Sequence, residues 1–199
     1  MKKFMDILAR IPRFWLFVAA GGLQVVLIAL MVGDRARILR TGTEITLKTV
    51  AVDPRDLLRG DYVVLNYEIS SVQTGDLSGT PAPKGDYFVY VKLAPAADGF
   101  HRAVSLHRER VPVAAGEVLI RGRINRGQNC GEQSSQFCPT MRLDYGLESF
   151  FVPQGEGRDL EQARNQGKLA VVAAVTPRGR AAIKRLMLDG KPVYDEPLF

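Results

Sequence analysis

Acidic residues in two segments of the chain are the groups whose type and spacing could support chemistry. They are Asp53, Asp56, Asp61, Glu148, Glu156, Asp159 and Glu161. If the two segments meet in space, two of these carboxylates could act as general acid and base, with Tyr62 or Tyr67 donating hydrogen bonds. Arg55, Arg59 and Arg158 lie among these acids, and carboxylates beside arginines more often form ion pairs that fix loops. We therefore favour a structural role over catalysis.

A glycine-rich turn before a predicted helix is a second candidate site. In "QGEGRDLE", the backbone N–H groups of Gly155 and Gly157, with Arg158, could bind a phosphate or a carboxylate at the helix N-terminus. Glu156, Asp159 and Glu161 compete for that position, because acidic side chains in a first turn already complement the helix dipole. Ordinary helix capping is the favoured interpretation.

The sequence offers little for nucleophilic or metal chemistry. The serine patterns G-x-S-x-G and S-x-x-K are absent. His101 and His107 would lie about 20 Å apart on a regular strand, and we interpret them as surface histidines. The two cysteines have no histidine near them, which leaves a tetrahedral metal site incomplete. We expect no metal and no cofactor.

Cys130 and Cys138 enclose the polar loop "GEQSSQF". A loop of this kind closes readily into a disulfide, which persists only in an oxidising compartment. Free thiols or a chemical role remain alternatives, although a redox pair more often has C-x-x-C spacing. The favoured disulfide places this loop outside the cytoplasm.

Residues 14–32, "FWLFVAAGGLQVVLIALMV", contain no charge and a single amide, Gln24. This run matches the roughly 20 residues that cross a bilayer core. A cleaved signal peptide is the alternative, but its apolar region is usually about 7–15 residues and ends in a small-x-small site, unlike "LIALMVGD". Gln24 and Gly21-Gly22 could mediate helix–helix contact, since small residues permit close approach in lipid. An ordinary anchor that tolerates these residues is the favoured reading.

Basic residues flank both ends of the apolar run, and the short N-terminal segment carries slightly more of them. The positive-inside rule then puts the N-terminus in the cytoplasm. The sequence predicts a single-pass inner-membrane protein. Its parts are a cytoplasmic segment (1–13), a transmembrane helix (14–32), a linker (33–42) and a β-rich periplasmic domain (43–199). The lipid bilayer is an expected partner through residues 14–32.

The net charge of +6 does not indicate nucleic-acid binding. About half of it lies in the first thirteen residues, and the rest of the chain has nearly balanced charges. The one basic cluster, residues 101–110, is too small for the clustered footprint that nucleic acid requires. We expect no nucleic-acid partner.

Beyond the apolar run, apolar and polar residues alternate with period two, which predicts strands. We expect about eight short strands, including one over 61–70 that buries Leu65 and Tyr67, and a two-residue hairpin turn at Asp189-Gly190. One short helix is predicted from about 156 to 166, with Gly167 as its stop. The predicted fold class is mainly β (α+β). It is an antiparallel β-rich sandwich or partly open barrel with one short helix, preceded by an N-terminal transmembrane helix.

The stretch "GDYVVLNY" fits the pattern G-D-Y-x-x-L-x-Y. Its fixed positions are Gly60, Asp61, Tyr62, Leu65 and Tyr67. Together with "VDPRDLLRGDYVVLNYEI" and "YGLESFFVPQGEGRDLE", it resembles the GDYXXLXY family of bacterial membrane-anchored proteins. Gln154 departs from the acidic residue expected before Gly155. The resemblance implies no activity, but it implies a companion role beside multi-spanning membrane proteins.

The candidate binding residues lie in these two blocks. They are Asn66, Arg59, Glu148, Gly155, Glu156, Gly157, Arg158 and Glu161. We favour a non-enzymatic, membrane-anchored binding or assembly module that is accessory to another integral membrane protein. The alternative is a carboxylate-dependent hydrolase acting on envelope glycan or peptide.

Overall fold

The computed structural model describes residues 12–51, 62–73, 78–79, 88–125, 140–151 and 157–197. The described residues divide into two units, residues 12–37 and residues 38–197. Helix α2 (Arg13–Thr41) supplies the described part of the first unit. The second unit holds all the described strands and one further helix.

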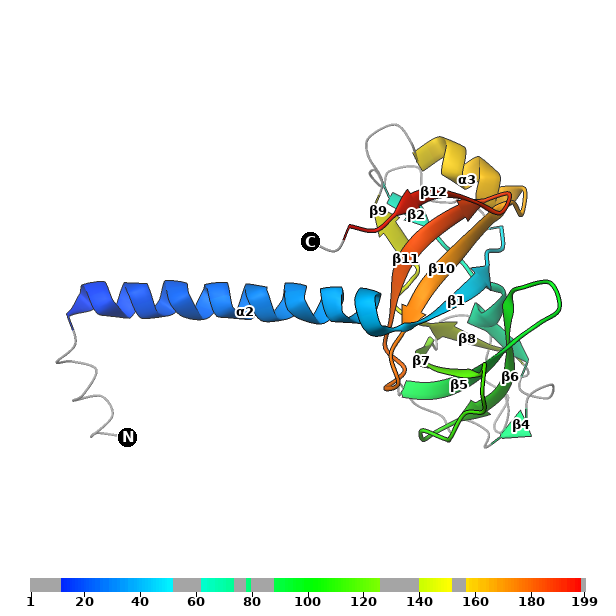
Figure 1. Ribbon diagram of the computed structural model, residues 1–199, viewed down its shortest axis with the longest axis horizontal. Coiled ribbons are helices and arrows are strands. Elements are labelled where there is room, and N and C mark those ends of the chain that lie inside the picture. The colour runs from blue at the N-terminus through cyan, green and yellow to red at the C-terminus, as the bar shows by residue number, and fades with distance from the viewer. Residues whose placement is uncertain are drawn as a thin grey trace, which may run out of the picture. The chain divides into compact units, whose positions relative to one another are not determined.

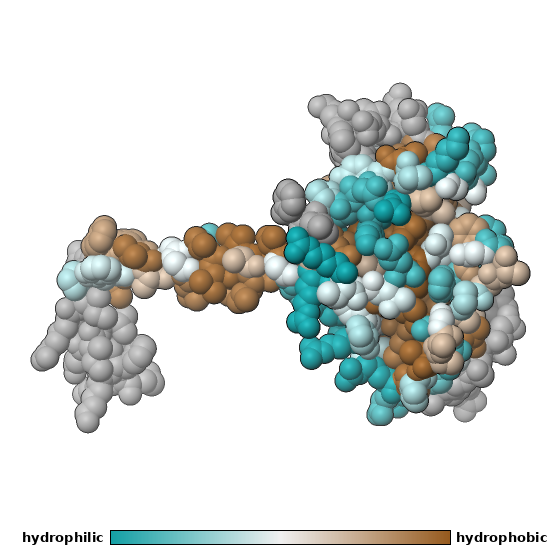
Figure 2. All heavy atoms as spheres, in the orientation of Figure 1, coloured by the Kyte–Doolittle hydropathy of each residue, from teal (hydrophilic) through white to brown (hydrophobic). Residues whose placement is uncertain are grey.

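Helix α2 contains the apolar run (14–32), and it is long and apolar enough to cross a membrane or to act as a signal sequence. Its side chains from Phe14 to Val32 are exposed, and brown, apolar residues mark the helix in Figure 2. The helix continues to Thr41 because residues 33–41 contain no proline and a single glycine. The stretch predicted as a linker is therefore helical almost throughout.

The helix ends where the chain enters the domain at Gly42. Ile38 and Leu39, in the last turn, are buried in the second unit. A Cβ on Gly42 would lie 2.7 Å from Ile38 O and 2.9 Å from Val175 N. Only glycine allows the backbone to pass this close to the strand that contains Val175.

The domain contains a nearly closed barrel of five antiparallel strands (Figure 1). Its strands, in spatial order, are β3 (Ser71–Gln73), β8 (Thr140–Asp144), β7 (Val118–Asn125), β5 (Phe88–Pro95) and β6 (His101–His107). A two-residue strand, β4 (Ser78–Gly79), pairs in parallel with β6. The 3₁₀ turn η1 (Glu68–Ser70), which precedes β3, contacts both β8 and β6.

A second sheet has the order β1 (Thr43–Lys48), β10 (Leu169–Val175), β11 (Ala181–Leu188) and β12 (Lys191–Asp195). All its neighbours are antiparallel. A small sheet joins β2 (Tyr62–Val64) to β9 (Ser149–Phe151). Helix α3 (Gly157–Asn165) contacts β2 and β10.

One continuous core joins the sheets. Barrel residues such as Val91 and Ile120 belong to the same buried cluster as Val171 and Leu186 of the second sheet. The turn before β11 also touches the barrel, because Arg121 N donates to Gly179 O at 2.8 Å. A Cβ on Gly179 would lie 3.0 Å from Arg121 N. The predicted fold class, a mainly β domain with a partly open barrel, one short helix and an N-terminal apolar helix, is confirmed.

Several local predictions are also confirmed. Asp189 and Gly190 both adopt positive φ, 48° and 77°, and connect β11 to β12, as a two-residue hairpin turn requires. Helix α3 stops at Gly167 in a Schellman arrangement, in which Lys168 N donates to Ala163 O and Gly167 N donates to Arg164 O.

The predicted strands differ from the observed ones in two respects. The expected strand over 61–70 ends at Val64, and the chain continues irregularly into η1. The described residues form twelve strands rather than about eight. Among them, β3 and β4 have only three and two residues, which is too short for an alternating pattern to reveal.

Candidate functional site

The two sequence blocks that carry the motif meet in space. Strand β2, from the first block, pairs with β9, from the second, in the register Tyr62↔Phe151, Val63↔Phe150 and Val64↔Ser149. Beyond the end of β2, Leu65 N donates to Glu148 O at 2.8 Å. The two blocks therefore form one structural unit, in which the backbone of each strand hydrogen-bonds to the backbone of the other.

Two buried tyrosines lock this unit together. Tyr67 Oη donates to Leu147 O at 2.6 Å. In the opposite direction, Tyr145 Oη donates to Ile69 O at 2.7 Å. Each block thus sends a phenol hydroxyl to a backbone carbonyl of the other, and both phenols are buried. We call these two hydrogen bonds the tyrosine clasp.

Glu148 supports the clasp from the side. Its Oε1 accepts a hydrogen bond from Tyr145 N at 2.5 Å, which fixes the turn that follows β8. Burial, with a smaller contribution from the Glu148 charge, holds the pKa of Tyr67 well above its usual value. The same two causes raise the pKa of Tyr145. Both hydroxyls therefore remain protonated donors at every physiological pH.

A buried arginine, Arg164, completes the unit from helix α3. Its Nη1 donates to Val64 O, the last carbonyl of β2. Its Nε and Nη2 both reach Asn165 Oδ1, at 3.1 and 3.0 Å. Burial lowers the pKa of Arg164, with an opposing contribution from Glu161. The planar guanidinium, with its several N–H donors, thus links helix α3 to the motif strand β2.

The structure places the predicted site residues as follows. Leu65 and Tyr67 are buried, as the alternation predicts. Asn66, Glu148 and Glu161 are half-buried. Next to Tyr67, the side chain of Glu68, which was not among the predicted residues, is exposed and pairs with Arg102.

Other predicted residues are placed only by their backbone. Tyr62 opens β2, Gly157 opens α3 and Arg158 follows it. Several lie outside the described residues: Arg59, Gly60, Asp61, Gly155, Glu156, Cys130 and Cys138. The acid/base hypothesis for Asp61 and Glu156 therefore stays a prediction.

The polar groups that hold the unit together already have hydrogen-bond partners. No group of three or more His, Cys, Asp and Glu residues in the described segments could hold a metal ion. Tyr67, Tyr145, Glu148 and Arg164 each have a hydrogen-bond partner within the unit. Tyr145 and Arg164 were not predicted as site residues, although Arg164 follows Leu160 by four residues and so shares its helix face.

The fold and the site define a mainly β domain behind an N-terminal apolar helix, with the GDYVVLNY strand clasped to a second block. The chain belongs to the GDYXXLXY protein family, whose model matches residues 24–186. No curated protein and no solved structure matches the chain.

Proposed function

We propose that this protein is a membrane-anchored, extracytoplasmic binding or assembly module that is accessory to a multi-spanning membrane protein. The main support for the proposal is that the described polar groups in and around the motif form hydrogen bonds within the domain. Tyr67 and Arg164 bond to backbone carbonyls of neighbouring segments, and Glu148 accepts from a backbone N–H of its own turn. Such an arrangement builds a rigid platform, which suits recognition better than bond cleavage.

The apolar helix supplies the second support. It is apolar over the whole run 14–32, with Gln24 as its single amide. A polar amide in a bilayer gains by donating and accepting across to another helix. Gly21 lies on the same face, three residues before Gln24, and lets a second helix approach closely. The proposed contact is therefore with a transmembrane helix of the partner.

A photo-crosslinking residue at Ile28, one turn after Gln24, is expected to capture one multi-spanning protein in native membranes. The same residue at Val26, about 200° around the helix from Gln24, is the matched control and should give little product. Replacing Gln24 by leucine should lower the Ile28 yield by about threefold or more, the range measured for interhelical polar contacts. The proposal fails if no membrane protein is captured, or if both positions capture the same background.

The proposed location is the inner membrane, with a single span, the N-terminus inside and the domain in the periplasm. The flanking basic residues support this orientation. The two cysteines agree with it, since a disulfide between Cys130 and Cys138 requires an oxidising compartment.

A disulfide at this position would stabilise the domain by about 2–3 kcal/mol on the chain-entropy model. Reductant should then lower the melting temperature of the purified chain by roughly 5–10 °C. The double variant Cys130→Ser, Cys138→Ser is the control and should melt at the reduced temperature with or without reductant. Two alkylatable thiols in the untreated protein, with an unchanged melt, would reject the disulfide.

A further inference from the structure

Strands β1 and β6 come together where the second sheet meets the barrel, and they share no ladder of backbone hydrogen bonds. β1 pairs with β10, and β6 pairs with β5 and β4. A side chain connects them: Thr46 N of β1 lies 3.3 Å from Nδ1 of His101, the first residue of β6. Because β1 directly follows α2 and Gly42, this bond ties the barrel to the strand nearest the N-terminal helix in sequence.

The chemistry of this bond fixes the protonation state of His101. A backbone N–H can only donate, so Nδ1 must accept through its lone pair. The ring is therefore neutral, with its proton on Nε2. If Nδ1 were also protonated, its N–H would face the Thr46 N–H. Neither group could accept, so the hydrogen bond would break.

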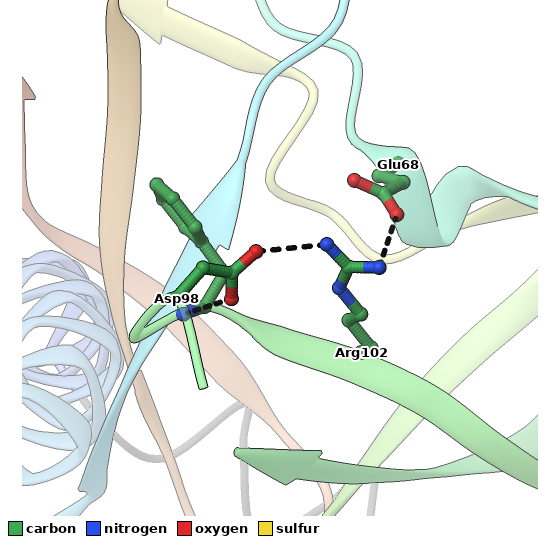
Figure 3. Close-up of polar contacts among 4 residues, drawn as sticks. Glu68, Asp98 and Arg102 are labelled. Atoms are coloured by element: carbon green, nitrogen blue, oxygen red, sulfur yellow. Dashed lines mark hydrogen bonds and ion pairs between the residues drawn. The ribbon is translucent and has the colours of Figure 1, made fainter. Parts of the chain in front are cut away.

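The elements next to this bond carry charged groups. On β1, Glu44 pairs with Lys184 of β11 at 2.6 Å, and Lys48 follows Thr46 by two residues. On β6, the guanidinium of Arg102 lies between Asp98 of the β5–β6 turn, at 2.8 Å, and Glu68 of η1, at 4.0 Å (Figure 3).

The Asp98–Arg102 ion pair of Figure 3 stays formed in mild acid. The Arg102 hydrogen bond is the main reason that the pKa of Asp98 lies below its usual value. Burial of His101 lowers the pKa of its imidazole from 6.5, and this effect outweighs an opposing contribution from the Thr46 backbone. His101 therefore titrates below pH 6.5, in a range where the Asp98 carboxylate is still ionised.

We propose that His101 is a proton-sensitive latch that closes β6 onto β1 when neutral and releases it on acidification. The folded state binds the His101 proton less tightly than the unfolded chain. The stabilisation from this group is then complete above pH 6.5 and is lost as the pH falls through the lower value of the folded state. The backbone ladders that join β5 to β6 and β7, together with the apolar core, hold the barrel together meanwhile, so the release is local.

The second histidine of the chain provides an internal control. His107 Nε2 lies 2.8 Å from Ser105 Oγ. A hydroxyl can either donate or accept, so this contact survives protonation by rotation of the Ser105 O–H. Only His101, whose partner is a fixed backbone donor, loses its bond.

The test is amide hydrogen exchange at Thr46 in the full-length protein in detergent micelles, from pH 7.5 to 5.0. Protection is expressed relative to the intrinsic exchange rate at each pH. It should be constant above about pH 6.5 and should then fall by up to about tenfold per pH unit. The ring signals of His101, followed by NMR on the same sample, should shift over the range in which protection falls.

Two variants distinguish the effect of protonating His101 from a general loosening of the domain at low pH. In His101→Asn, the amide oxygen remains an acceptor that does not titrate, so protection at Thr46 should be independent of pH. His107→Asn should keep the wild-type profile. The proposal is overturned if wild-type protection at Thr46 stays flat to pH 5.0, or if His107→Asn abolishes the fall. The wild-type and His107→Asn profiles decide this even if His101→Asn does not fold.

Discussion

Tyr67→Phe is expected to lower the free energy of unfolding of the domain by about 1–3 kcal/mol. The ring still fills the core, but the buried carbonyl of Leu147 loses the hydroxyl that satisfies it. Tyr145→Phe should cost a similar amount, because it leaves Ile69 O without its donor. Thermal unfolding followed by near-ultraviolet circular dichroism should show each loss as a shift of roughly 2–4 °C per kcal/mol.

Tyr90→Phe is the matched control for both changes. Tyr90 is half-buried on β5, and its hydroxyl has no hydrogen bond within the described segments, so its loss should stay within about 0.5 kcal/mol. The double variant of Tyr67 and Tyr145 tests whether the clasp acts as one unit. Because both bonds join the same two segments, the combined loss should differ from the sum by about 0.5 kcal/mol or more. Strict additivity would mean two independent contacts.

The same clasp sets the behaviour of the protein at high pH. In the unfolded chain a tyrosine ionises near pH 10, whereas the folded pKa values of Tyr67 and Tyr145 are higher because of burial and Glu148. Above about pH 10 the folded state therefore binds more protons than the unfolded state, and stability falls as the pH rises. Each Tyr→Phe variant should weaken this alkaline dependence, which a pH series of the same melts measures.

Alternation in the sequence predicted which residues of the motif face the core, but not what holds them. Leu65 and Tyr67 alternate with polar neighbours, and burial follows from that pattern even though the strand itself ends at Val64. The strand ends because its partner is only three residues long. Strand length depends on the partner across the sheet, which lies over 80 residues away in the chain, and local alternation carries no information about it.

Helix α3 was predicted with nearly the correct bounds because its ends carry local signals, above all the glycine stop at Gly167. The burial of Arg164 was missed for the opposite reason. Arginine is usually solvated, and this one is buried because the carboxyl end of β2 lies beneath it and offers Val64 O. The spacing of Leu160, Ala163 and Arg164 puts them on one helix face, and this pattern favours burial of Arg164. The general expectation that arginine is exposed outweighed it.

Arg164→Met should destabilise the domain by about 2–3 kcal/mol, because Val64 O is left without a donor and the tie between α3 and β2 is lost. Arg164→Lys should be nearly as costly. The acceptors of Arg164 are neutral oxygens, Val64 O and Asn165 Oδ1, so the planar fork matters more than the charge, and an ammonium cannot reproduce it.

Arg178→Met is the control for Arg164, since Arg178 is exposed in the turn between β10 and β11, and it should change stability by less than about 0.5 kcal/mol. Denaturant unfolding of the three variants decides between two explanations of the buried cation. Buried ionic groups are sometimes replaced by apolar ones with no loss. If Arg164→Met unfolds like the wild type, the arginine does not hold the motif strand. If Arg164→Lys is as stable as the wild type, the site requires a positive charge rather than the planar guanidinium.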